Sequence, residues 1–236
     1  MKKRILIIFV LTFFYNINYA QSKYSLGLLL GPNYSSFRGS DFLDSTKSDF
    51  GFIAGVFVEF KLNKSFSVST GINIEQKTIT NETDYMVDNI DFNGNFVVIE
   101  SINAKTNNRY QYFSVPLFLK YSFGKNKSFY LNGGPYISFL QKHKKETEFK
   151  NNNGGSIIRS SDSKVNFPLA DYVSGDYGFS LGIGKIFEID MKNKISIELR
   201  NNLGLKNTIE DIQVYGQSGV IKTNTLNLIG NWSFNL

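Results

Sequence analysis

Hydrophobic and polar residues alternate along most of the chain, and the alternation is sharpest over residues 110–140, YQYFSVPLFLKYSFGKNKSFYLNGGPYISFL. Two alternating segments meet there at a short polar stretch, Lys125, Asn126 and Lys127. Successive side chains of a β-strand point to opposite faces, so each segment has one apolar face and one mixed face. The pattern predicts a β-hairpin with the three polar residues as its loop.

The apolar face also determines how the two arms pair, because a shift of one residue would turn the whole face around. We expect apolar partners on this face and polar or small partners on the other. The predicted apolar pairs are Phe123 with Phe129, Tyr121 with Leu131, Leu117 with Pro135, Val115 with Ile137 and Phe113 with Phe139. The predicted pairs on the opposite face are Lys120 with Asn132, Phe118 with Gly134 and Ser114 with Ser138.

The same alternation recurs in six further stretches, which together with the two hairpin arms predict eight strands. The connections between the strands alternate between long and short. The further stretches are residues 24–34, 50–62, 66–75, 177–184, 195–202 and 225–236. The long connections are residues 35–49, 82–109, 146–171 and 206–220, which are expected to be polar loops, the second with a small hairpin around residues 96–99.

Alternating long and short connections are typical of an up-and-down barrel in a bacterial outer membrane, which has short periplasmic turns and long outer loops. The apolar face of residues 113–123 spans eleven residues, and a tilted membrane strand needs about 9 to 11. A closed ring also leaves no unpaired strand edge in lipid. We therefore expect an all-β fold, an eight-stranded antiparallel up-and-down transmembrane β-barrel.

The first residues, MKKRILIIFVLTFFYNINYAQ, have the three parts of a secretory signal peptide. Three basic residues precede a ten-residue apolar run, and a less apolar stretch ends at Ala20. The apolar run is well short of the roughly 20 residues that a membrane-spanning helix needs. We expect cleavage near Ala20, so that residues 1–20 are a signal peptide and residues 21–236 form one barrel domain in the cell outer membrane.

Removing the signal peptide also lowers the net charge of the chain. The whole chain has 26 basic and 20 acidic residues, and cleavage removes three basic ones, which leaves 23 against 20 and a net charge of +3. No stretch interleaves basic with aromatic residues, so nucleic acid is not an expected partner. The chain has no cysteine, which excludes disulfides, thiol catalysis, zinc–cysteine sites and a lipoprotein anchor.

Several charged residues lie on the faces opposite the apolar ones and would point into the barrel. Eight strands leave an interior just wide enough for side chains to fill, and buried opposite charges have to pair. We expect a structural polar network in this lumen, and an ion path is the alternative for the same residues. The predicted network consists of Glu59, Lys61, Glu75, Lys120, Glu198 and Arg200. The glycines expected to make room for bulky neighbours such as Phe57 and Phe118 are Gly55, Gly71, Gly182 and Gly184.

No catalytic, cofactor-binding or metal site is expected. The single histidine, His143, lies in KHKK at the outer end of the fifth strand, where serine esterase chemistry would need a partnered serine beside it. We expect His143 to be exposed, in a basic rim that meets anionic lipid head groups. The acidic residues Asp41, Asp44 and Asp49 have a spacing that fits no calcium-binding loop, so solvated charge is the expectation.

Four segments resemble a known family: residues 27–35 (GLLLGPNYS), 112–123 (YFSVPLFLKYSF), 130–140 (YLNGGPYISFL) and 177–184 (YGFSLGIG). They are similar to the PorT-like outer-membrane β-barrel domain family of Gram-negative bacteria, over nearly the whole mature chain. The resemblance implies an integral outer-membrane barrel of about eight strands. Some members of that family assist protein secretion or gliding-type machinery. No functional residue is carried over, because the segments encode barrel geometry rather than chemistry.

The expected function is a structural or interaction role of a monomeric outer-membrane barrel, through its long extracellular loops. An accessory role in protein secretion would be one form of it. The expected partners are outer-membrane lipid and lipopolysaccharide, with an unknown protein at the outer loops. Three alternatives stay open from the sequence: a soluble lipocalin-like ligand-binding barrel with its apolar faces inward, a small outer-membrane pore, and an outer-membrane enzyme.

Overall fold

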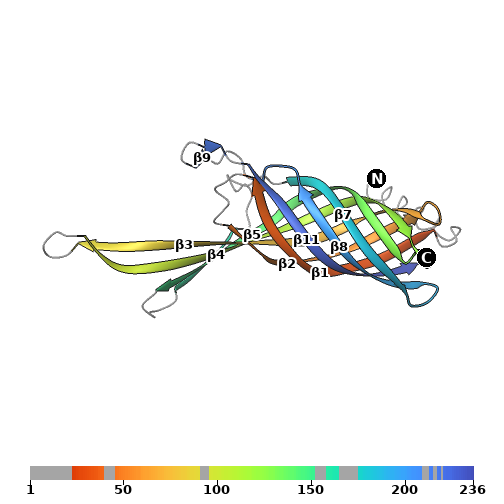
Figure 1. Cartoon of the computed structure of the whole chain (residues 1–236), viewed down its shortest axis with the longest axis horizontal. Helices are drawn as coiled ribbons and strands as arrows, with labels where there is room; N and C mark the ends of the chain where they lie inside the picture. Colours follow the sequence, from red (N-terminus) through yellow and green to blue (C-terminus); the bar gives the residue numbers. More distant parts are fainter. Residues whose placement is uncertain are drawn as a thin grey trace, which may run out of the picture.

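Eight antiparallel strands close into a ring (Figure 1). The computed structural model describes residues 23–39, 46–90, 96–151, 158–164, 175–208, 213–214, 217–218 and 220–236. The ring consists of β1 (Tyr24–Gly39), β2 (Thr46–Lys61), β3 (Phe66–Ile90), β4 (Phe96–Phe123), β5 (Phe129–Asn151), β7 (Gly175–Glu188), β8 (Asn193–Gly204) and β11 (Ile221–Asn235), and β11 pairs back with β1. The predicted fold class is confirmed. The predicted signal peptide, residues 1–20, lies outside the described residues, as do Asp41 and Asp44.

The remaining elements are short. Strand β6 (Ile158–Lys164) pairs with the outer part of β5. Strands β9 (Gln213–Val214) and β10 (Gln217–Ser218) pair with each other. A single 3₁₀ turn, η3 (Lys125–Lys127), joins β4 to β5 at the position of the predicted loop. In the part of the chain that the structure describes, no helix is long and apolar enough to cross a membrane.

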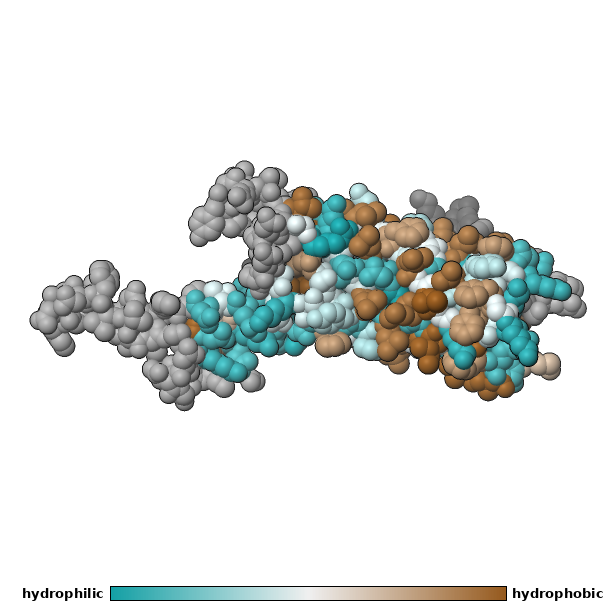
Figure 2. Space-filling view, viewed as in Figure 1, coloured by the Kyte–Doolittle hydropathy of each residue, from teal (hydrophilic) through white to brown (hydrophobic). Residues whose placement is uncertain are grey.

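Apolar side chains cover the outside of the barrel, and polar ones dominate its inside. Along β1, Leu28 keeps 51% of its surface exposed, whereas its inward neighbour Leu29 keeps 5%. The outward residues form an apolar belt around the barrel (Figure 2). A belt of this size is stable in lipid rather than in water. The soluble lipocalin-like alternative is therefore wrong, because it requires the apolar faces to point inward.

The predicted register of the central hairpin is confirmed. The structure pairs Phe113 with Phe139, Ser114 with Ser138, Val115 with Ile137, Lys120 with Asn132, Tyr121 with Leu131 and Phe123 with Phe129. The two other predicted pairs, around Leu117 and Phe118, lie between Pro116↔Tyr136 and Leu119↔Gly133, which keep the same register. Matching apolar faces is thus enough to align two strands whose outer sides share the same lipid.

The first three long connections are strands over much of their length, which corrects the expectation of loops there. Among the described residues of the fourth, residues 206–220, strands are limited to β9 and β10. Strands β3 and β4 stay paired out to Ile90↔Phe96, and β5 continues beyond the ring to pair with β6. Water on both faces removes the apolar alternation that marks a membrane strand, whereas backbone pairing continues. We call this extension the outer sheet. It consists of residues 78–90 of β3, 96–111 of β4, 141–151 of β5 and all of β6, and it projects far beyond the barrel (Figure 1).

The short turns, the start of β1 and the C-terminus lie at the opposite end of the barrel from the outer sheet (Figure 1). The turns are residues 62–65, 124–128 and 189–192. Beside them, the backbone amide of Leu236 donates to the carbonyl of Tyr24 at 3.0 Å. The predicted arrangement, with the short turns at one end of the barrel and the long connections at the other, is confirmed. Paired strands rather than loops make up much of those long connections.

Candidate functional site

The lumen contains two clusters of charged side chains, one near the short turns and one near the outer sheet. In the first, Glu59 of β2 accepts hydrogen bonds from Lys120 Nζ and from Ser67 Oγ, each at 2.8 Å. Lys120 projects from β4 across the lumen, and its ammonium lies 4.2 Å from the ring centroid of Tyr130. The aromatic face and the carboxylate together stabilise the ammonium away from bulk water.

A second ion pair lies beside the first, on β8. Glu198 Oε1 accepts hydrogen bonds from Arg200 Nε at 2.5 Å and from Asn132 Nδ2 at 3.0 Å. Its other oxygen accepts the hydroxyl proton of Tyr130 at 2.8 Å. The Arg200 guanidinium lies over the ring of Phe118, 4.8 Å from its centroid. This buried carboxylate therefore has the partners that burial of a charge requires.

The cluster near the outer sheet is centred on Lys77 of β3, whose side chain is almost fully buried. Its ammonium lies 3.7 Å from Asp176 Oδ2 and 3.9 Å from Glu75 Oε2, and it donates to Thr223 Oγ1 at 3.0 Å. Thr223 Oγ1 donates in turn to Asp176 Oδ2 at 2.9 Å. The ring of Tyr112 adds a cation–π contact at 4.9 Å. One cation thus holds together two carboxylates that would otherwise repel each other inside the protein.

The outer sheet carries ion pairs on a polar surface. Lys47 donates to Glu82, and Arg109 Nη1 lies 2.9 Å from Glu146 Oε2. The hydrogen bond from Lys47 holds the pKa of the Glu82 carboxyl below its usual value. The hydrogen bond from Lys144 does the same for the pKa of Glu146. These exposed pairs contribute little to stability, so they indicate a hydrated surface rather than a core.

One edge of the outer sheet is open along its backbone. Within the described residues, β2 begins opposite Asn81 of β3, so residues 82–90 of β3 are paired on one side only, with β4. An edge strand of this length presents a row of backbone donors and acceptors that can pair with another chain.

The sequence can now be placed among known proteins. The family model described as "Outer membrane protein beta-barrel domain" matches residues 19–210. The chain belongs to this family. Family membership implies a location in the outer membrane, in agreement with the apolar belt. No curated protein matches the chain. Membership of the narrower PorT-like group stays a prediction.

Solved outer-membrane barrels resemble this one over most of their length. Neisserial surface protein A is 11% identical, with 91% of this chain and 98% of that one covered and a TM-score of 0.46. Ail of Yersinia pestis is 14% identical, with 90% and 99% covered and a TM-score of 0.39. The N-terminal barrel domain of Pseudomonas aeruginosa OprF is 12% identical, with 92% and 100% covered and a TM-score of 0.38.

All six residues of the predicted network lie on strands of this outer-membrane barrel, with side chains on its inner side. Glu59 pairs with Lys120, Glu198 with Arg200, and Glu75 with Lys77, while Lys61 donates to Asn235 Oδ1 at 3.2 Å near the short turns. Sequence reasoning missed Lys77 and Asp176 because it ended one strand at Glu75 and began another at Tyr177. One more period of alternation would have placed both residues inside. That the network serves structure alone stays a prediction.

His143 was expected at the surface, and the structure buries it. Its ring stacks on Tyr110 with centroids 4.5 Å apart, and its Nε2 lies 3.2 Å from Asn108 Oδ1. The cause is a β-bulge, because Gln111 pairs with Lys142 and the next residue, Tyr112, with Leu140. The extra residue of β5 reverses the alternation beyond it. Across the described residues, no group of three or more Asp, Glu or His side chains is arranged to hold a metal ion.

The inward glycines leave room for large side chains, and Gly184 gives a test. A Cβ at Gly184 would lie 2.3 Å from Cζ of Tyr130, whose ring is held in place by its bond to Glu198. We expect Gly184→Ala to destabilise the barrel by about 1 to 3 kcal/mol, as overpacking does in tight interiors. Urea unfolding in detergent micelles would measure it.

Gly230→Ala is the matched control, because the nearest atom to its Cβ would be the carbonyl oxygen of Leu30 at 3.7 Å. An equal loss of unfolding free energy in both variants would contradict the close approach of the Tyr130 ring to Gly184. The ring of Phe57 lies against Gly27 rather than against a predicted glycine, and a Cβ at Gly71 would instead meet the carbonyl oxygen of Val56 at 2.2 Å. Gly55 and Gly182 lie against Asn73 and Asn132. Phe118, the other expected neighbour, contacts Arg200 instead.

Proposed function

We propose that the protein is an outer-membrane barrel that holds a protein-binding surface, the outer sheet, outside the cell. The observation that carries this proposal is the continuous pairing of β3 with β4 out to Ile90↔Phe96, well beyond the apolar belt. A barrel that served only to span the membrane would not need a paired extension of this length. The polar side chains that the structure describes on it, and the edge of residues 82–90 that no described strand pairs with, suit a partner rather than lipid.

Export and orientation follow the same proposal. Residues 1–20 would direct export and be cleaved, and the short turns would face the periplasm. The exposed lysines at the base of the outer sheet, Lys142 and Lys145, would meet phosphate groups of lipid and lipopolysaccharide. The barrel would act as a monomer, without nucleic acid. An accessory role in protein secretion is the narrower form of this function, and its support is the resemblance to PorT-like proteins.

Binding rather than catalysis is the role that the described residues favour. His143 is buried by Tyr110 and engaged with Asn108, so its imidazole is not presented to an outside substrate. The recognition mode that fits best is addition of a partner strand to residues 82–90 of β3, where backbone hydrogen bonds supply affinity.

Site-specific photocross-linking in intact cells tests the proposal. A photoreactive residue at Thr83 or Lys105, both exposed on the outer sheet, is expected to capture a protein. The same residue at Lys64, exposed on a short turn, is the control and should not capture that protein. Capture from all three positions alike, or from Lys64 alone, would contradict a partner at the outer sheet.

A further inference from the structure

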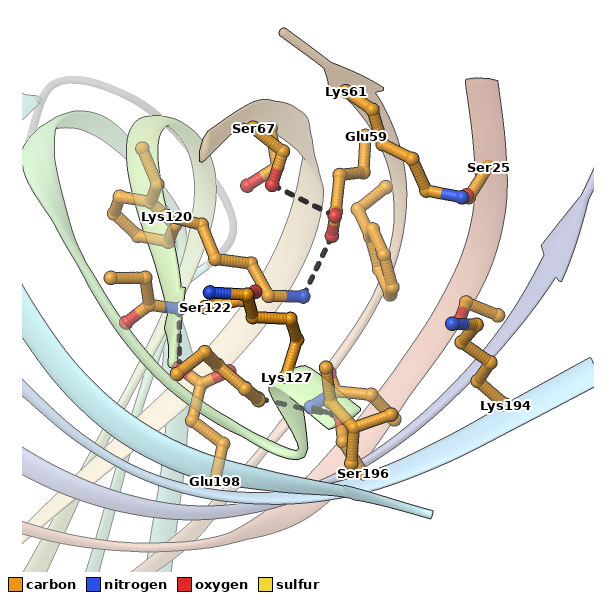
Figure 3. A pocket seen from close by; sticks show the side chains of 18 of the residues that line it. Ser25, Glu59, Lys61, Ser67, Lys120, Ser122, Lys127, Lys194, Ser196 and Glu198 are labelled. Atoms are coloured by element: carbon orange, nitrogen blue, oxygen red, sulfur yellow. Dashed lines mark hydrogen bonds and ion pairs between the residues drawn. The ribbon is translucent and has the colours of Figure 1, made fainter. Parts of the chain in front are cut away.

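The lumen contains a cavity of about 460 Å³ at the end of the barrel that carries the short turns (Figure 3). Its wall combines turn residues, such as Lys64 and Lys127, with inward strand residues, such as Glu59 and Lys120. Lys64 and Lys127 are exposed, so the cavity opens at this end. Its volume lies in the range of small-molecule sites, about 300 to 1,000 Å³.

The cavity ends where the lumen is filled. Ile53, Lys77 and Ile229 each keep 1% or less of their surface exposed. With Leu29, Ile53 and Ile229 form an apolar layer inside the barrel, and Lys77 and its carboxylates lie nearer the outer sheet. The opening at the short turns is therefore the route by which a molecule reaches the cavity in the described structure.

Cationic side chains outnumber carboxylates in the wall. The six cations are Lys61, Lys64, Lys120, Lys127, Lys194 and Arg200, and the three carboxylates are Glu59, Glu188 and Glu198. Each carboxylate already lies close to one cation: Glu59 to Lys120 at 2.8 Å, Glu188 to Lys194 at 2.6 Å and Glu198 to Arg200 at 2.5 Å. The cavity as a whole is left with a surplus of positive charge, which walls of low dielectric concentrate.

The wall also contains hydrogen-bond donors that could bind an oxyanion. Figure 3 shows Lys61, Lys127 and Lys194 around the cavity, and they come from β2, η3 and β8. Hydroxyl groups of Ser122 and Ser196 lie in the same wall, whereas the hydroxyl of Ser25 donates its proton to Asn235 Oδ1 at 2.7 Å. Ammonium and hydroxyl donors from several elements suit the tetrahedral oxygens of a phosphate.

We propose that this cavity binds a small phosphate-bearing molecule that enters from the periplasmic side, with its phosphate among Lys61, Lys127 and Lys194. The phosphate could belong to a soluble metabolite or to the head group of an inner-leaflet lipid, and the chemistry of recognition is the same. The proposal is independent of what the outer sheet binds, because a filled stretch of lumen separates the two sites.

Titration of the full-length barrel with inorganic phosphate tests the proposal, in nanodiscs of phosphatidylcholine at constant ionic strength. Backbone amide NMR shifts are expected at cavity residues and should saturate with a Kd of about 1 mM. The double variant Lys61→Gln/Lys127→Gln should weaken binding about tenfold, at a few-fold for each lost charge. Both positions lie outside the three ion pairs between cavity side chains.

The matched control is Lys125→Gln/Lys192→Gln, which removes the same charge from the same end of the barrel. Neither residue belongs to the cavity wall, so phosphate binding should be unchanged. If the natural occupant is a lipid, replacing phosphatidylcholine by phosphatidylglycerol should shift the same cavity residues without added phosphate. Equal weakening in both double variants, or shifts confined to the turn surfaces in both lipids, would overturn the proposal.

Discussion

Replacing Lys77 with alanine is expected to destabilise the barrel by about 3 to 5 kcal/mol, the usual cost of removing one partner from a buried ion cluster. Lys77 is the cation that lies between Glu75 and Asp176, and its side chain is only 2% exposed. Without it, two carboxylates would be buried side by side. Unfolding by urea in lipid vesicles, followed by the fluorescence of the single tryptophan, Trp232, would measure the loss.

The triple variant Lys77→Met/Glu75→Gln/Asp176→Asn is the control, because it removes the charges together and should recover most of the stability. An unchanged urea midpoint for Lys77→Ala alone would contradict the buried cluster. The same cluster bears on the pore alternative. Since it fills the lumen, the unaltered protein should give no steady conductance in planar bilayers, and a steady conductance would contradict a filled lumen.

Replacing Leu117 with arginine is expected to cost about 2 to 4 kcal/mol, because its outward side chain lies near the middle of the apolar belt. The matched control is Leu62→Arg, on a short turn, which should cost about 0 to 1 kcal/mol. Both leucines are 53% exposed, so the two variants differ in depth rather than in exposure. Reversible unfolding in lipid vesicles separates them, and equal costs would mean that the belt does not lie in lipid.

The membrane part of the barrel could be predicted because lipid imposes one rule on it. Outward positions must be predominantly apolar, so residues such as Leu28 and Leu117 mark the face and its register together. The hairpin between β4 and β5 follows from this rule alone. The rule stops at the membrane, so the sequence pattern predicts loops where the outer sheet lies, although the backbone of β3 and β4 pairs there as it does in the barrel.

The burial of His143 and the Lys77–Asp176 contact depend on a β-bulge and on closure of the ring, and neither feature changes the pattern of apolar and polar residues. One extra residue in β5 turns His143 inward, and a bulge has no apolar signature of its own. Lys77 and Asp176 lie just beyond the last apolar residues of their strands, where the pattern gives no reason to continue. Their contact joins β3 to β7, which are far apart in sequence, and only the closed ring brings them together.

The outer sheet also sets a height for whatever it binds. Residues 78–90 of β3 are 13 residues, and at about 3.3 Å for each they reach roughly 40 Å above the belt. The polar layer of a bilayer is only about 5 to 8 Å thick on each side. A partner at the tip would therefore approach without displacing lipid. Lengthening or shortening both paired strands by two residues, which keeps each side chain on its face, would move its docking point by about 6.6 Å, so the strand length sets the distance between membrane and partner.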